Sequence, residues 1–414
     1  MGEDNAFYYR IQSQVVMIEF DHHKGVVLNN PTPEKFHVHT IVRNGNDYGI
    51  DLLRLHYETA ASGRVTCTLR SRECLCRQAP SGSVSWPPRS RYCCRSAWLA
   101  RKISQKTYVM KLSTSTLNDA PHQFIKDFGA AVERDSGGRI KAEVYPSGQL
   151  GSIPRQVEGV QFGSIEGLVM PPEFMVGVDE RFEVMAAPGL VDSFDHAQRV
   201  AADPAVWKLM LGLGATKGLH GVGLIMSQPS SVISKAGIRH LADFKGKKIR
   251  IFASQFQTEA FNRLGATPVA MSLGDVLPAL QQGAIDGANA GIGPFVSFHF
   301  VDAAKYVTEI NQPAIFMMLE VSQKWYGSLP KDLQEIVDRD GAAASAAMGP
   351  VAPAMFSAQR KAWVDSGGEL ISLPQDEQSA MMATLTNVGA DVAKSKPAVL
   401  DAYQIVADAA QRTR

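Results

Sequence analysis

Arg250 is the residue whose type and position most clearly predict chemistry in this chain. It lies within a predicted strand, residues 248–252, that reads Lys-Ile-Arg-Ile-Phe. A guanidinium presents a planar fork that pairs with a carboxylate through two parallel N–H···O bonds, a geometry that lysine does not supply. A surface arginine on a strand end has the same local sequence, so this run alone leaves both interpretations open.

Further candidate site residues lie near the ends of predicted strands. Glu173 follows a predicted strand over 165–170 and is placed to accept a hydrogen bond from a hydroxyl group or to bind a cation. A solvated loop carboxylate is the equally weighted alternative. The candidate walls of a site are Phe174, Phe252, Gln255, Phe256, Asn289, Phe295 and Trp325. Apolar residues of this kind are more often core than pocket, and Gln255 and Phe256 are favoured because they follow closely on Arg250.

The elements that must position these residues alternate between strand and helix. From residue 107 onward we predict strands over 108–113, 139–145, 165–170, 248–252 and 267–271, with helices between them beginning near Asp119, Ile153, Gln257 and Ser272. This alternation indicates a mostly parallel sheet with crossover helices. Two such units in succession predict two α/β lobes with a cleft between them. Pro278 falls inside a predicted helix, and Gly349, Pro350 and Pro353 should break or kink the helix that begins near Asp332.

Length and composition exclude several classes of protein. The chain has 414 residues, 45% of them hydrophobic, which is enough for two or three domains with hydrophobic cores. Its net charge is +1. The sequence contains no run of about 18 apolar residues, so we expect no membrane-spanning helix. The first 25 residues contain no basic start followed by an apolar stretch, which is the pattern of a secretory signal. No nucleophile elbow, Walker loop, HExxH motif or dinucleotide fingerprint occurs. We therefore expect no enzyme and no nucleic-acid partner.

Several motifs in a fixed order give the part from Thr107 onward a specific resemblance. They are Tyr145-Pro-Ser-Gly-Gln-Leu-Gly151, Val157-Glu-Gly-Val-Gln-Phe-Gly163, the Arg250 strand, Leu264-Gly-Ala-Thr-Pro268 and Ala279-Leu-Gln-Gln-Gly-Ala-Ile-Asp-Gly287. Together they resemble the DctP-like solute-binding proteins of tripartite ATP-independent periplasmic (TRAP) transporters over residues 107–414. In that family the arginine of the matching strand grips the carboxylate of the cargo, which is the role the resemblance implies for Arg250.

The resemblance implies a type II periplasmic-binding fold, with two lobes around a cleft, hinge strands and a long helix. Family topology places lobe one at about 107–227 and 316–355 and lobe two at about 228–315, with the C-terminal segment across both. It also implies capture of an organic acid in the periplasm, delivery to membrane permease subunits and no cofactor, although a metal ion bridging the cargo stays open. A binding protein of an ABC importer with the same fold is the alternative.

Two departures from the family pattern bear on the cargo. A second arginine common in the family is replaced here by the segment Gln228-Pro-Ser-Ser231, and Asn289 stands one place out of step with the family asparagine. We therefore expect a cargo with one main carboxylate and a more apolar remainder.

The N-terminal part has a different character. Residues 1–60 predict strands over 7–11, 15–20 and 37–43 and a short helix over 51–57, and they resemble the C-terminal tail of an uncharacterised bacterial protein family. Residues 61–106 contain all five cysteines and ten Lys and Arg against one acidic residue, Glu73, without helical or strand periodicity. We expect this stretch to be a disordered linker that reflects a frame shift or the joining of two genes.

Histidines and cysteines in this part leave one alternative open. His22, His23, His37, His39 and His56, or the cysteines between Cys67 and Cys94, predict a metal- or nucleic-acid-binding module with residues 107–414 as its scaffold. Their spacings complete no known ligand set. The histidines are therefore favoured as surface or half-buried residues of a β-ribbon, and the cysteines as part of the predicted linker.

Overall fold

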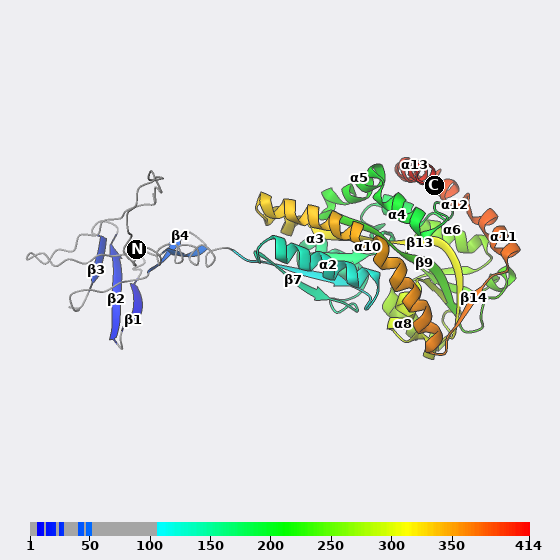
Figure 1. Cartoon of the computed structure of the whole chain (residues 1–414), viewed down its shortest axis with the longest axis horizontal. Coiled ribbons are helices and arrows are strands. Elements are labelled where there is room, and N and C mark those ends of the chain that lie inside the picture. Colours follow the sequence, from blue (N-terminus) through cyan, green and yellow to red (C-terminus); the bar gives the residue numbers. More distant parts are fainter. Residues whose placement is uncertain (1–5, 12–13, 22–24, 29–39, 45–46, 52–105) are drawn as a thin grey trace, which may run out of the picture. The chain divides into compact units, whose positions relative to one another are not determined.

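The computed structural model describes residues 6–11, 14–21, 25–28, 40–44, 47–51 and 106–414. The chain divides into two compact units, Met1–Lys106 and Thr107–Arg414, and Figure 1 shows both. In the first unit, β1 (Ala6–Ile11), β2 (Gln14–Asp21) and β3 (Gly25–Leu28) form an antiparallel sheet, and β4 (Thr40–Asn44) pairs with β5 (Asp47–Asp51). The five histidines, the five cysteines and most of the predicted linker lie outside the described residues. Of the helix predicted over 51–57 only Asp51 is described, and it ends the strand β5.

The second unit is built on a nine-stranded mixed sheet whose order is β11-β10-β12-β9-β13-β8-β6-β7, with β14 paired to β13. The strands are β6 (Tyr108–Thr114), β7 (Ile140–Tyr145), β8 (Gly167–Met170), β9 (Leu219–Ser234), β10 (Lys248–Ile251), β11 (Thr267–Ala270), β12 (Gly287–Ala290), β13 (Tyr306–Ser322) and β14 (Glu369–Ser372). Strands β6, β7 and β8 are parallel to one another, as are β10, β11 and β12. Each parallel set is joined by helices, as the alternation of elements predicts.

Two long antiparallel strands connect the parallel sets. β9 pairs with β12 at its C-terminal end and with β13 along most of its length, while β13 also pairs with β8. The strands β6–β8 with their helices therefore form lobe one, β10–β12 with theirs form lobe two, and β9 and β13 run through both. This arrangement is the two-lobed α/β fold expected from the sequence.

Helices cover both faces of the sheet (Figure 1). They are α2 (Ala120–Asp135), α3 (Ile153–Phe162), α4 (Phe194–Ala202), α5 (Pro204–Gly212), α6 (Gln255–Arg263), α7 (Val276–Gln282), α8 (Ile292–Ser297), α9 (Gln323–Ser328), α10 (Lys331–Asp365), α11 (Gln375–Leu385), α12 (Val388–Ala393) and α13 (Pro397–Arg412). Short 3₁₀ turns η2 (Pro172–Met175) and η3 (Glu180–Ala186) lie between β8 and α4. One buried cluster joins α2, α8 and α10 to the sheet, and a second joins α3, α4, α5 and α13 to it.

The long helix α10 packs along β9 and bends partway along its length (Figure 1). Close packing requires a glycine at position 341, since a Cβ there would lie 2.2 Å from the carbonyl oxygen of Val222. Pro350 and Pro353 bend α10 without ending it. Pro353 has no N–H for the carbonyl of Gly349, and Gln198 donates its side-chain Nε2 to that oxygen at 2.6 Å instead.

Local signals explain where the helices beside the cleft begin. The side chains of Asp119 and Ser254 accept backbone N–H groups at the starts of α2 and α6. Pro278 is the third residue of α7, where a backbone N–H would have no partner within the helix, so it costs no helical hydrogen bond. The sequence prediction placed this helix start too early, and the internal proline is thereby explained.

Candidate functional site

Arg250 lies near the carboxyl end of β10, and its side chain is buried, with 1% of its surface exposed. Its Nε donates to the carbonyl of Met271, just after β11, and its Nη1 donates to the carbonyl of Asn289 in β12, each at 2.9 Å. The guanidinium carbon lies 4.8 Å from the centre of the Phe252 ring. The two neighbouring strands thus hold the guanidinium in a fixed plane. Nη2 is buried and has no hydrogen-bond partner in the part of the chain that the structure describes.

Among the described residues, no carboxylate pairs with the charge of Arg250. Burial lowers the pKa of Arg250 to about 9, and no carboxylate in the described part of the chain offsets that effect. A buried cation with an unused donor costs free energy unless an anion reaches it. The arrangement is suited to bind a negatively charged group at Nη2.

A narrow cavity of about 30 Å³ lies beside Arg250, at the carboxyl ends of the parallel strands of both lobes. Lobe one contributes Ser115, Thr116, Ile153, Pro171 and Phe174; lobe two contributes Arg250, Phe252, Leu273, Ala290, Gly291 and Pro294; and the crossing strands contribute Gln228, Ile315 and Met317. This volume holds about one or two water molecules. The lobes are therefore closed on each other here, and a larger molecule enters only when they separate.

Gln228 enters this cavity from β9 and is packed against lobe two. Its Oε1 accepts the backbone N–H of Gly293 at 3.1 Å. A glycine is required at position 291, because a Cβ there would lie 2.0 Å from Cδ of Gln228. The side chain of Asn289 is buried beside the cavity, donating to Ser230, and its Oδ1 has no partner. Asn289 supports the site through its carbonyl bond to Arg250.

Glu173 lies in η2, next to the cavity residue Phe174, and is itself buried without lining the cavity. Burial raises the pKa of Glu173 to about 8, and the nearby charge of Glu183 adds to the rise. Its Oε2 has no hydrogen-bond partner. Glu183 by contrast is paired, because it accepts from the backbone N–H of Gln255 at 2.7 Å and from Nζ of Lys396 at 3.2 Å.

The structure places the predicted site residues in three different settings. Arg250, Phe174 and Phe252 line the cavity, with the two phenylalanine rings 5.5 Å apart. Glu173 and Asn289 lie directly behind it. Gln255, Phe256 and Trp325 are not in its wall: Gln255 is exposed, Phe256 is buried edge-on against Tyr403 of α13, and Trp325 packs in the core from α9. Phe295 is also fully buried, against Phe300 and Trp363.

Sequence reasoning did not select the remaining wall residues, of which Ser115, Thr116, Ile153, Gln228 and Leu273 are examples. Ser115 and Thr116 directly follow β6, and Leu273 lies three residues after the end of β11. Ligands in open α/β sheets bind outside the carboxyl ends of the strands. Ser115, Thr116 and Leu273 could therefore have been predicted from the sequence, as residues that follow the predicted parallel strands.

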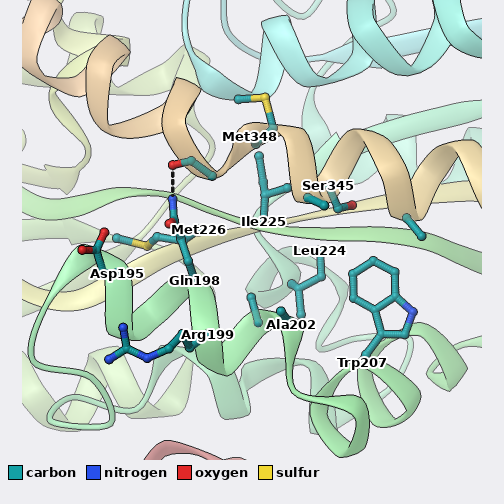
Figure 2. Close-up of a pocket in the computed structure, with 14 residues that line it drawn as sticks. Asp195, Gln198, Arg199, Ala202, Trp207, Leu224, Ile225, Met226, Ser345 and Met348 are labelled. Atoms are coloured by element: carbon teal, nitrogen blue, oxygen red, sulfur yellow. Dashed lines mark hydrogen bonds between the residues drawn. The ribbon is translucent and has the colours of Figure 1, made fainter. Parts of the chain in front are cut away.

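A larger cavity, about 610 Å³ in volume, lies between α4, α5, β9 and α10 (Figure 2). Trp207, Leu224, Met226 and Met348 line it, and Gln198 spans it to the backbone of α10. It shares no lining residue with the Arg250 cavity, and none of its lining side chains has a buried polar atom without a partner. Size alone therefore does not identify the site, whereas the unused guanidinium nitrogen does.

The described residues contain no group of three or more His, Cys, Asp or Glu side chains placed to hold a metal ion. The helices described here include none that is both long and apolar enough to cross a membrane.

Comparison with known proteins identifies the family of the chain. The profile of bacterial extracellular solute-binding proteins, family 7, matches residues 113–396, and a family of proteins of unknown function, DUF3500, matches residues 1–50. An uncharacterised protein of Salmonella typhimurium is 31% identical over 211 residues, which cover 51% of this chain and 64% of that protein. The C4-dicarboxylate-binding periplasmic protein of Rhodobacter capsulatus is 25% identical over 296 residues, covering 69% of this chain and 86% of that protein.

Solved structures share the fold. A TRAP periplasmic solute-binding protein from Desulfovibrio salexigens with bound orotic acid superimposes with a TM-score of 0.70 at 21% identity, covering 74% of this chain and all of that one. A counterpart from Xanthobacter autotrophicus with bound β-D-galacturonate gives a TM-score of 0.66 at 24% identity, covering 72% and 99%. With the family profile spanning most of its length, the chain belongs to the bacterial extracellular solute-binding proteins of family 7.

Proposed function

We propose that this protein captures a small organic acid outside the cytoplasm and delivers it to the membrane permease of a TRAP transporter. Family membership supports this role. So do the ligands named for proteins of the same fold, which include orotic acid, galacturonate, succinate and galactonate. All of these ligands are acids.

The observation that carries the proposal is the unpartnered Nη2 of Arg250, buried at a cavity that both lobes line. Two carbonyl groups already hold the guanidinium in place, so binding a carboxylate requires no reorganisation of the arginine. The carboxylate would supply the missing counter-ion and stabilise the closed lobes. The closed form is then the form that the permease recognises.

The experiment is a thermal-shift and calorimetric screen of small carboxylic acids against the full chain and its Arg250→Met variant. An acid present at 100 times its Kd should stabilise the wild-type protein by about 2.7 kcal/mol, and should stabilise a variant that binds at least tenfold more weakly by no more than about 1.4 kcal/mol. Because Arg250 itself supplies the positive charge, we expect binding to persist in excess EDTA. If no acid stabilises the wild-type chain, or if each acid stabilises both proteins equally, the proposal is wrong.

Delivery is tested separately. Uptake of the identified acid into vesicles that contain the permease subunits should require the wild-type chain, and the Arg250→Met variant should not replace it. Uptake at the same rate without the chain would contradict the role in delivery while leaving ligand capture intact.

A further inference from the structure

The wall of the Arg250 cavity carries one charge. Of its fourteen lining residues, Arg250 is the only ionisable one, and Ser115, Thr116 and Gln228 are the only other residues with polar side chains. The remaining lining residues are apolar: two phenylalanines, two prolines, an alanine, a glycine, and Ile153, Leu273, Ile315 and Met317. The cavity therefore offers one ionic contact, a few neutral ones and an otherwise apolar surface.

We infer that the cargo is a compact monocarboxylate with an apolar body. This inference rests on the proposed function and names the substrate class of that same site. One guanidinium matches one carboxylate, and a second carboxylate would be buried without a counter-ion. The hydroxyl groups of a sugar acid would face hydrocarbon and lose their hydrogen bonds to water. Dicarboxylates and sugar acids are therefore rejected, although proteins of the same fold bind them.

Gln228 is the residue that decides against a second charge. It is 2% exposed, lines the cavity from the crossing strand β9, and presents a neutral amide in place of a second cation. Its Oε1 is engaged by Gly293, which leaves the amide nitrogen as a neutral donor. A single oxo or hydroxyl oxygen next to the carboxylate of the cargo is the group that this donor accommodates.

The size of the site limits the apolar body. The cavity measures about 30 Å³, and the rings of Phe174 and Phe252, one from each lobe, stand 5.5 Å apart beside it. Each atom of cargo beyond this volume must be accommodated by separating the lobes, which removes contacts between them. A short branched chain fits this requirement better than a long or cyclic one.

Calorimetry on the full chain tests the inference with four acids and an uncharged control. The acids are 3-methylbutanoate, 3-methyl-2-oxobutanoate, succinate and D-galacturonate, and the control is 3-methylbutanamide. We expect the two branched monocarboxylates to bind at least about tenfold more tightly than the other acids and the amide not to bind. Gln228→Arg should move the preference toward succinate by about tenfold or more. The neutral Gln228→Met variant, matched in length, should keep the preference for monocarboxylates.

The failures are distinguishable. If succinate or galacturonate binds the wild-type chain as tightly as the branched acids, and this binding is lost in Arg250→Met, capture of carboxylates stands and the inference on the cargo is overturned. If Gln228→Arg folds, as judged by its circular dichroism, yet leaves the preference unchanged, the role of Gln228 is refuted. If none of the acids binds, or binding does not depend on Arg250, the proposed function fails and the inference fails with it.

Discussion

Replacing Arg250 with methionine should weaken ligand binding strongly while leaving the fold intact. The side chain makes two hydrogen bonds to carbonyl groups and has one nitrogen, Nη2, for the ligand. A hydrogen bond between charged groups is worth about 1.5–3 kcal/mol. Since about 1.4 kcal/mol is tenfold in affinity, the variant should bind about 10- to 150-fold more weakly.

Stability should respond much less than affinity. The substitution leaves the carbonyls of Met271 and Asn289 without their donor, which destabilises the protein. It also removes a buried cation whose pKa is lowered to about 9 by burial, and this removal stabilises the protein. The two effects oppose each other, and methionine fills most of the volume of the arginine.

The assay is calorimetric titration of the wild type, Arg250→Met and Arg250→Lys with the best acid from the screen, with thermal unfolding measured in parallel. Lysine keeps the charge but cannot bond both carbonyls and the ligand in one plane, so it should also weaken binding by about tenfold or more. Unchanged affinity in a folded Arg250→Met variant would refute the reasoning.

Three further predictions concern Glu173, Glu183 and Gly291. Burial raises the pKa of Glu173 from 4.5 to about 8, so between these pH values the folded protein keeps a proton that the unfolded chain releases, and the free energy of unfolding falls as the pH rises. In urea denaturation at about pH 5 and about pH 8, Glu173→Gln should show a smaller fall than the wild type. Equal falls in the two proteins would contradict this prediction. Glu183→Ala removes the acceptor for the start of α6 and should lower the free energy of unfolding by about 1.5–3 kcal/mol, with Glu183→Gln losing less; a loss under about 0.5 kcal/mol contradicts the role of this contact. Gly291→Ala should displace Gln228 and weaken ligand binding, because the new Cβ would lie 2.0 Å from Cδ of Gln228. In a Gln228→Ala background the same change should have little further effect on affinity. Equal losses of affinity in both backgrounds would show that the two positions are not coupled.

The sequence predicted those elements whose signals are local. α2 begins after its cap Asp119, and α3 runs over Ile153–Phe162 and ends at Gly163, as expected. The five predicted strands lie within about two residues of β6, β7, β8, β10 and β11, whereas β12 was not predicted. Periodicity, caps and glycines act over a few residues, so they can be recognised without knowledge of the fold. The family motifs around Arg250 identified the family for the same reason, since they are contiguous.

Long-range packing decided the rest. Nothing local in β9 or β13 indicates that these strands, 16 and 17 residues long, would pair with each other and run through both lobes. Their pairing brings Gln228 to Arg250, although 21 residues of chain lie between them. Phe256 follows Arg250 closely in sequence, yet α6 turns it toward Tyr403 of α13 and away from the cavity.

The sequence by itself therefore determined the lobes' α/β units, the family and the cation at the end of β10. Only the tertiary structure decided which neutral side chains surround that cation, because the rotation of a helix and the register of two long strands depend on surfaces contributed by distant parts of the chain.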